Sequence, residues 1–347
     1  MNNRLYIANT KASQLVLLIL TNPIDGISRI EVPTPFPVGS VNCYMIEGSP
    51  LTLIDTGPKT PESLEKIRHE LGNLQYDLSD IEQILLTHNH IDHIGLTAEF
   101  VRERARAHNS ATKVWIHQSD IDAVVDYERF MDHYTDSFVK LIAKSGVPEK
   151  EMSMASPKRL IAYFKSFGES VPSACSFDSN ASFKTGIGEI TVVWVPGHSP
   201  GSTCFVCDEK QVIFSGDHIL GDISSNPSIS FDNSEKIGML TYLESLDRIS
   251  SKEDYVALPG HREPILDMKS RIKALHVDYD DKLKKAVDAL TFDHQTLYEV
   301  SRSVYGDYDS NSLALALAES QDLVKILEQR NQARVTNQNG VLHVVKQ

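Results

Sequence analysis

Cysteine, long apolar runs and positive charge are all scarce in this sequence. The four cysteines, Cys43, Cys175, Cys204 and Cys207, are too few and too scattered for a disulfide framework, so a reducing compartment is the simpler expectation. The apolar run Leu15–Leu20 is too short to span a bilayer and lacks a cleavage site of small residues. We therefore expect a cytoplasmic protein without membrane association.

The charge balance is acidic, with a net charge of -13 at pH 7. Proteins that bind nucleic acids neutralise phosphates with clustered Lys and Arg, and this composition argues against such a surface. Residues 281–347 contain eight Lys and Arg against nine Asp and Glu, so they offer a poor electrostatic basis for a nucleic-acid module. The 41% of hydrophobic residues is enough for a substantial core.

Cys204 and Cys207 have the spacing of a redox or metal-binding pair. They lie in Ser202–Cys207, which has the composition of a β-strand. Residues three apart in a strand point to opposite faces, so the two thiols cannot share a ligand. We interpret both as small buried hydrophobes.

Short runs rich in β-branched residues alternate with helical patterns along most of the chain, which predicts a mixed α/β fold. In the first half, strands are expected at Ile30–Val32, Val41–Ile46, Leu51–Asp55, Ile84–Thr87 and Lys113–His117, and helices at Pro61–Leu74 and Leu96–His108. In the second half, strands are expected at Ile190–Val195, Cys204–Cys207, Val212–Phe214 and Tyr255–Leu258.

Two regions have a more helical character. Residues 121–167 carry aromatic and aliphatic side chains at helical spacing, with a second helix expected at Leu160–Phe167. This helical pair either packs on the core or in a dimer interface, or forms an aromatic cover over the active site. After Pro264, helices are expected at Arg271–Leu290, Gln295–Tyr305 and Leu313–Arg330, followed by a hairpin around Asn337–Gly340.

Histidine and aspartate are concentrated in one short turn. Three histidines and one aspartate, His88, His90, Asp92 and His93, follow the predicted buried strand Ile84–Thr87. Imidazole and carboxylate are the ligands that zinc and its first-row neighbours prefer. One turn cannot enclose an ion alone, so further ligands must come from elsewhere in the chain.

Three further candidates stand at the ends of predicted strands. His198, Asp217 and His261 each follow a glycine directly, which allows close backbone approach and redirects the next side chain. Three such endings after one histidine-rich turn predict a common metal centre. The remaining histidines carry no such pattern. His117 and His133 are expected to be structural, and His218 is expected near the metal because it adjoins Asp217.

With Asp55 in Leu53–Gly57 as a fifth motif, the sequence resembles the metallo-β-lactamase superfamily of binuclear metallohydrolases over roughly Ile27–Leu266. The resemblance implies an α/β fold, an αββα sandwich with the site at one edge. It divides the chain into an N-terminal extension (1–26), a catalytic domain (27–270) with a helical insert at about 121–167, and a winged-helix-like C-terminal module (271–347).

The resemblance also implies a role for each site residue and two divalent metal ions, with zinc expected and iron or manganese as alternatives. Asp55 would support the ligands by hydrogen bonding, and Asp92 and His93 would serve catalysis as well as metal binding. One ion would be held by His88, His90 and His198, the second by Asp92, His93 and His261, and Asp217 would bridge the two.

The implied reaction is hydrolysis of a small ester or thioester by a metal-bridging hydroxide. The ligand order most resembles the glyoxalase II-like branch, part of which carries a C-terminal winged-helix extension. The expected partner is a small acyl substrate, and a homodimer is a further expectation. The alternatives are a lactonase, a metal-dependent ribonuclease, which the charge balance disfavours, and a catalytically weak binding or regulatory protein, which the intact motifs disfavour.

Overall fold

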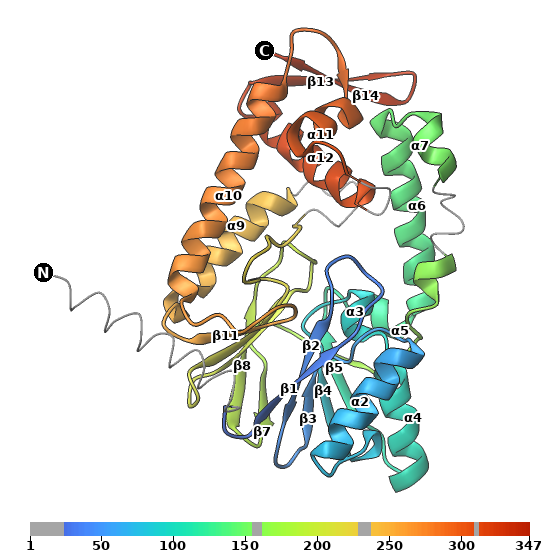
Figure 1. Ribbon diagram of the computed structural model, residues 1–347, viewed down its shortest axis with the longest axis vertical. Helices are drawn as coiled ribbons and strands as arrows, with labels where there is room; N and C mark the ends of the chain where they lie inside the picture. The colour runs from blue at the N-terminus through green and yellow to red at the C-terminus, as the bar shows by residue number, and fades with distance from the viewer. Residues whose placement is uncertain (1–23, 155–161, 228–236, 309–311) are drawn as a thin grey trace, which may run out of the picture.

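The computed structural model describes residues 24–154, 162–227, 237–308 and 312–347 (Figure 1). Nearly all of the predicted N-terminal extension, including Leu15–Leu20, and the start of the helix predicted at Leu160 lie outside these residues. Residues 162–165 are helical as predicted, but residues 166 and 167 form a turn, so the helix ends two residues earlier than predicted. Among the described residues, no helix is both long and apolar enough to cross a membrane.

Two β-sheets form the centre of the molecule. The first has the order β1-β2-β3-β4-β5-β6 and the second the order β11-β10-β9-β8-β7. The first sheet consists of β1 (Ile27–Val32), β2 (Val41–Ile46), β3 (Thr52–Ile54), β4 (Gln83–Leu85), β5 (Lys113–His117) and β6 (Cys175–Phe177). The second consists of β7 (Ser182–Thr185), β8 (Gly188–Trp194), β9 (Thr203–Cys207), β10 (Val212–Gly216) and β11 (Val256–Pro259).

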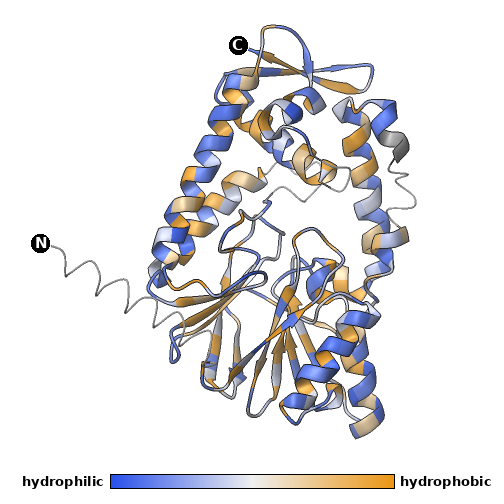
Figure 2. Ribbon diagram, in the orientation of Figure 1, coloured by the Kyte–Doolittle hydropathy of each residue, from blue (hydrophilic) through white to orange (hydrophobic). Residues whose placement is uncertain are grey.

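Helices cover the outer face of each sheet, which gives the predicted αββα sandwich (Figures 1 and 2). The first sheet is covered by α2 (Pro61–Asn73) and α4 (Thr97–His108), and the second by α9 (Gly238–Ile249) and α10 (Met268–Ala289). The sequence reading missed α9, although Met239, Tyr242 and Leu246 are buried at helical spacing. Shorter elements are η1 (Leu78–Asp80), α3 (Ile91–Ile94), α5 (Asp122–Val125), α7 (Glu149–Met154) and η2 (Ser250–Lys252).

Three hydrophobic clusters correspond to the three interfaces of this sandwich. One lies between the first sheet and its helices, one between the two sheets, and one between the second sheet and its helices. Cys204 belongs to the cluster between the second sheet and its helices, and Cys207 belongs to the cluster between the two sheets. The two thiols therefore point to opposite faces of the sheet, as predicted. Phe205 and Phe214 fill the space between the sheets, and burial of each such ring stabilises the fold by roughly 2 kcal/mol.

The helical insert packs on the core of the molecule. Its main helix, α6 (Tyr127–Ser145), places Tyr127 and Met131 in the cluster beneath the first sheet. Farther along the same helix, Phe138 and Leu141 join the cluster of the second sheet and the C-terminal helices. Thus α6 connects the first layer of the sandwich to the C-terminal module, along the right of Figure 1.

The C-terminal module contains the predicted helices and hairpin. It consists of α10, α11 (Leu297–Tyr305), α12 (Leu313–Gln329) and a small sheet of order β12-β14-β13, formed by β12 (Gln295–Thr296), β13 (Ala333–Gln338) and β14 (Val341–Lys346). The prediction of helix from Gln295 is wrong for the first two residues, which pair with β14. The reason is local, because Thr296 and Glu299 form a capping box that starts the helix at Leu297.

Candidate metal centre

Five strand ends meet at one edge of the sandwich. Asp55 directly follows β3, the histidine-rich turn follows β4, Asp217 follows β10 and His261 lies just beyond β11. The pairs β3–β4 and β10–β11 are parallel, so their carboxyl ends face the same edge. His198 lies on the connection from β8 to β9. The loops that carry all these residues therefore converge above the two sheets.

The glycine before each later candidate has the expected function. Gly197 and Gly216 have φ values of +146° and +48°, a backbone region that other residues rarely occupy. A Cβ atom on Gly260 would lie 2.4 Å from Asp217 Oδ1 and 2.7 Å from a ring carbon of His93. A side chain at residue 260 would thus enter the centre itself.

The structure brings all seven predicted ligands together, as two separate groups with Asp217 near both. We call His88, His90 and His198 the imidazole group, and Asp92, His93 and His261 the mixed group. Within each group one potential ligand atom per residue lies within 4.8 Å of the others, and the same holds for His88, His93 and Asp217. The groups coincide with the division that the resemblance implied; the role of each residue as a ligand stays a prediction.

Asp217 occupies the position between the groups. Its Oδ1 lies 3.4 Å from His93 Nε2, and its Oδ2 lies 3.5 Å from His261 Nε2 and 3.6 Å from His198 Nε2. Asp92 Oδ2 lies 3.4 Å from His261 Nε2. A single carboxylate therefore faces imidazoles of both groups.

Hydrogen bonds at Nδ1 orient the histidine rings. His93 Nδ1 lies 2.8 Å from Asp55 Oδ2, and His261 Nδ1 lies 2.7 Å from the Ser40 carbonyl oxygen. His198 Nδ1 lies 3.1 Å from the carbonyl oxygen of Asn226. An imidazole that donates from Nδ1 keeps the Nε2 lone pair for a metal ion.

The atoms that face the centre fit a cation. The Nε2 atoms of His88, His93, His198 and His261 are buried and have no hydrogen-bond partner among the residues that the structure describes, and the same holds for Asp217 Oδ1. Buried polar atoms are otherwise almost always paired. Four imidazole nitrogens and a carboxylate oxygen that converge unpaired are a donor set suited to divalent first-row metals.

Asp55 supports the centre from a strained backbone position. Its φ of +58° is left-handed, a conformation that Asp tolerates better than most residues. Its carboxylate accepts from the Thr87 backbone N–H and the Thr87 hydroxyl, both at 2.8 Å, besides its contact with His93. The Thr87 hydroxyl also lies 3.0 Å from His88 Nδ1. Asp55 therefore contacts His93 of the mixed group directly, and it is connected to His88 of the imidazole group through the Thr87 hydroxyl.

The protein shifts the pKa values of the histidines in the two groups in opposite directions. Burial lowers the pKa of His88 well below its usual range and that of His90 to about 3. In the mixed group burial acts in the same sense, but the carboxylates of Asp217 and Asp92 outweigh it and raise the pKa of His261 to about 10. The pKa of His93 is raised for the same reason. Without a cation, the mixed group thus retains protons that the imidazole group does not.

Asp120 is a supporting residue that the sequence reading missed. It is 2% exposed, and it accepts hydrogen bonds from Ser199 Oγ at 2.6 Å and from the Gly201 backbone N–H at 2.9 Å. Burial raises its pKa to about 7, although the bonds from Ser199 and Gly201 and one from the Asn89 backbone act in the opposite direction. Asp120 therefore ties the loop after His198 to the histidine-rich turn.

Gly197–Gly201 matches the Gly-x-Ser-x-Gly spacing of a serine-hydrolase nucleophile. Ser199 is 3% exposed, and its hydroxyl lies between Asp120 Oδ2 and Ser202 Oγ. Within the described residues its hydrogen bonds include no imidazole that could act as a base. The hydroxyl is thus a fixed structural donor, and the motif carries no nucleophile.

The three other histidines singled out from the sequence lie in different surroundings. His117 stacks on Trp194, with 5.3 Å between ring centroids, which is a structural contact as expected. His133 is exposed on α6. His218 is 1% exposed and packs edge-on against Tyr242. Burial lowers the pKa of His218 to about 3.

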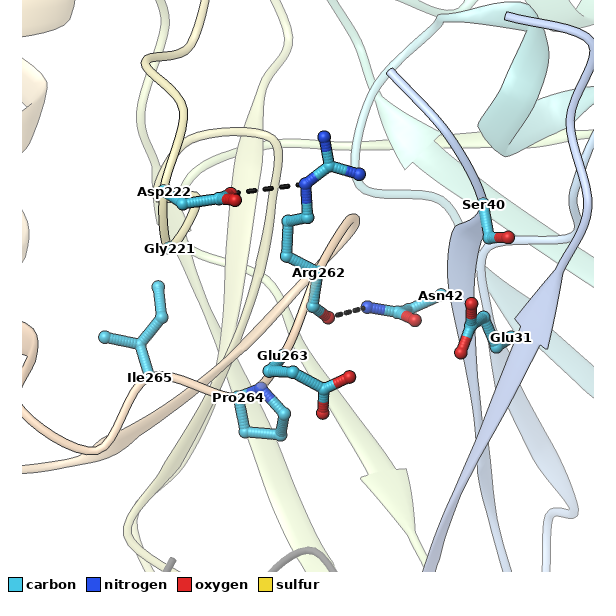
Figure 3. Close-up of a pocket in the computed structure, with 9 residues that line it drawn as sticks. All are labelled: Glu31, Ser40, Asn42, Gly221, Asp222, Arg262, Glu263, Pro264 and Ile265. Atoms are coloured by element: carbon cyan, nitrogen blue, oxygen red, sulfur yellow. Dashed lines mark hydrogen bonds and ion pairs between the residues drawn. The ribbon is translucent and has the colours of Figure 1, made fainter. Parts of the chain in front are cut away.

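A pocket of about 510 Å³ adjoins the mixed group (Figure 3). The Arg262 side chain crosses it and donates to Asp222 at 3.2 Å, while the Arg262 carbonyl accepts from Asn42. Ser40, whose carbonyl accepts from His261, also lines it. None of its nine lining residues is a predicted ligand, so the pocket lies beside the centre and not within it.

Comparison with known proteins identifies the family. A model of the metallo-beta-lactamase superfamily matches residues 36–261, a span that contains all seven predicted ligands. The chain therefore belongs to the metallo-beta-lactamase superfamily. The match supports a metal-dependent hydrolase, in agreement with the donor set described above.

Similar proteins include several with hydrolase names. The probable metallo-hydrolase YqjP of Bacillus subtilis is 28% identical over 88% of this chain and 92% of its own length. Thioesterase pkgB of Emericella nidulans is 24% identical over 74% of this chain, and the atrochrysone carboxyl ACP thioesterase nsrC of Aspergillus novofumigatus is 25% identical over 79%. This chain spans 57% and 63% of the lengths of those two thioesterases.

Solved structures show the same fold. The metallo-beta-lactamase family protein TTHA1429 of Thermus thermophilus superposes with a TM-score of 0.79 at 22% identity, over 93% of this chain and 99% of that one. A beta-lactamase domain protein of Burkholderia ambifaria gives 0.74 at 20% identity, over 93% of each chain. Both matches extend well beyond residues 36–261, so the shared fold includes much of the C-terminal module.

Proposed function

We propose that this protein is a binuclear metal-dependent hydrolase that cleaves a small thioester or ester. The observation that carries the proposal is the convergence of buried, unpaired ligand atoms from two groups on one shared carboxylate, Asp217. The names of two relatives favour a thioester among the candidate bonds. The proposed substrate is a small acyl compound and not a nucleic acid, because residues 281–347 carry no excess of positive charge.

When bound, two divalent ions would polarise the substrate carbonyl and make water acidic enough to act as a nucleophile near pH 7. The protein's own contribution is to position their ligands. Asp55 and the Ser40 carbonyl fix the rings of His93 and His261 through Nδ1. Asp217 supplies negative charge between the two groups, in a buried site where electrostatic interactions are strong.

Within the superfamily we place the protein in the glyoxalase II-like branch that carries a winged-helix-like extension. Helices α10 to α12 followed by the β13–β14 hairpin support this placement. We propose zinc as the metal, because five of the six residues in the two groups are histidines and imidazole suits zinc. Iron and manganese are the alternatives, since the same ligands accept them.

The experiment is a substrate comparison on protein of measured metal content. Acyl thioesters of coenzyme A, aryl esters, lactones and a labelled single-stranded RNA are each incubated with the enzyme as purified, stripped of metal and reconstituted. We expect thioester or ester hydrolysis that disappears on stripping and returns on reconstitution. Metal-dependent cleavage of RNA alone would make the protein a nuclease, and full metal occupancy without any turnover would favour a regulatory binding protein.

A further inference from the structure

The loop of residues 220–227 has a direct connection to the candidate metal centre. It follows Asp217 and contains no helix or strand. Its Asn226 carbonyl oxygen is the partner of His198 Nδ1, at 3.1 Å. This bond sets which nitrogen of His198 faces the centre, so the position of the 220–227 loop determines the geometry of one predicted ligand.

The loop is held mainly by side chains of α10. The Arg271 guanidinium donates to the carbonyl oxygens of Leu220 and Ile223. About two and three turns farther along the helix, Tyr279 donates its hydroxyl to the Ser225 carbonyl, and Lys282 Nζ donates to Ser224 Oγ at 2.8 Å.

A second helix of the C-terminal module completes this support. Lys282 Nζ also lies 3.0 Å from Glu319 Oε1 on α12, and Glu319 is 5% exposed. On the loop itself, Asn226 Nδ2 donates to the carbonyl oxygen of Leu315 on α12, at 3.3 Å. The residue whose carbonyl orients His198 is therefore anchored through its own side chain to the module.

We propose that the C-terminal module positions His198 by clamping the 220–227 loop, with Arg271, Tyr279 and Lys282 as the positioning residues. A loop without helix or strand bonds depends on such side-chain anchors for a fixed place. The module thereby acts on the imidazole group, whereas the mixed group is oriented by Asp55 and Ser40. This inference rests on the metal centre of the proposed function but is independent of the proposed substrate.

The test measures metal affinity in the full-length protein. Metal-free protein is titrated with Zn²⁺ against a chromophoric chelator, and the visible absorption of the Co²⁺-loaded protein reports ligand geometry. We expect Lys282→Met to weaken the binding of one of the two ions by roughly 10-fold and to change the Co²⁺ spectrum. Lys282→Arg, which keeps a donor, should restore much of both. Lys285→Met, at an exposed lysine of the same helix, serves as the matched control.

Tyr279→Phe keeps the test valid if Lys282→Met fails to fold, because it deletes only the hydroxyl. Thermal unfolding of each variant identifies a loss of structure. Wild-type affinity and spectrum in folded Lys282→Met and Tyr279→Phe would overturn this inference while leaving the metal centre intact. A wild-type protein that binds no metal would instead overturn the proposed metal centre and this inference together.

Discussion

The imidazole group and the mixed group lie side by side but have opposite electrostatic character. His88 and His90 are surrounded by other imidazoles, and burial keeps their pKa values low. His93 and His261 face the carboxylates of Asp217 and Asp92, which raise their pKa values. The first group is therefore ready for a cation at neutral pH, whereas the second must first release protons. In the proposed binuclear centre, the two groups should thus respond differently to the same change in pH.

The largest expected effect is that of Asp217→Asn, which removes the negative charge between the two groups. Asp217 is close to both groups, so removing its charge should lower the affinity for both ions and the hydrolysis rate, each by at least about 100-fold. Metal content after dialysis and the rate on the best thioester are measured together. Asp208→Asn, an exposed aspartate on the β9–β10 turn, is the control. A variant with two tightly bound ions and wild-type turnover would contradict the assignment of Asp217.

The pH dependence of metal binding separates the two groups. The raised pKa of about 10 for His261 means that a proton is bound below that pH and must leave when an ion enters. Affinity at the mixed group should fall by about 10-fold per pH unit between pH 9 and 6 for one displaced proton, whereas the imidazole group should change little. Chelator competition at several pH values measures this, and calorimetry in two buffers counts released protons. Equal pH slopes for both ions would be inconsistent with the comparison.

Smaller effects are expected from the two buried aspartates that support the groups. Ser199 and Gly201 each donate to a different carboxylate oxygen of Asp120, and Asp120→Asn keeps only one acceptor oxygen. We therefore expect this variant to lower the metal affinity of the imidazole group by roughly 10-fold. It should also cost about 1–2 kcal/mol of unfolding free energy. Asp55→Asn should weaken mainly the mixed group through His93. Ion-resolved titrations and denaturant unfolding of both variants check this, and an interchange of the two effects would refute it.

The sequence predicted most strands of the two sheets, although not β6 or β7, and it predicted the residues that converge at one edge of the sandwich. Buried strands are short apolar runs, and a ligand that follows such a run through a glycine is a local pattern visible at His198, Asp217 and His261. Asp120 has no such pattern, because it is a lone aspartate after β5 whose partners lie 79 and 81 residues away. Contacts that connect distant loops cannot be read from periodicity.

Backbone groups are similarly invisible to motif reasoning. The carbonyl oxygens of Ser40 and Asn226 orient two of the histidines, and any residue type offers the same atom. The orientation of α6 was ambiguous for a related reason. Its apolar positions form one pattern, yet Met131 and Phe138 pack into different clusters at the two ends of the helix. An amphipathic pattern indicates that a face is buried without indicating against what.

The continuous apolar cluster between the second sheet and its helices restricts where the protein can be truncated. Val206 and Ile213 of the sheet, Leu275 of α10 and Leu317 of α12 all belong to it, and α6 contributes Leu141. A protein ended near residue 270 would expose this surface to water and lose the anchors of the 220–227 loop. The C-terminal segment therefore cannot be exchanged independently of the rest of the fold. Chimeras with other members of the superfamily should take α6, α10 and α12 from the same parent protein.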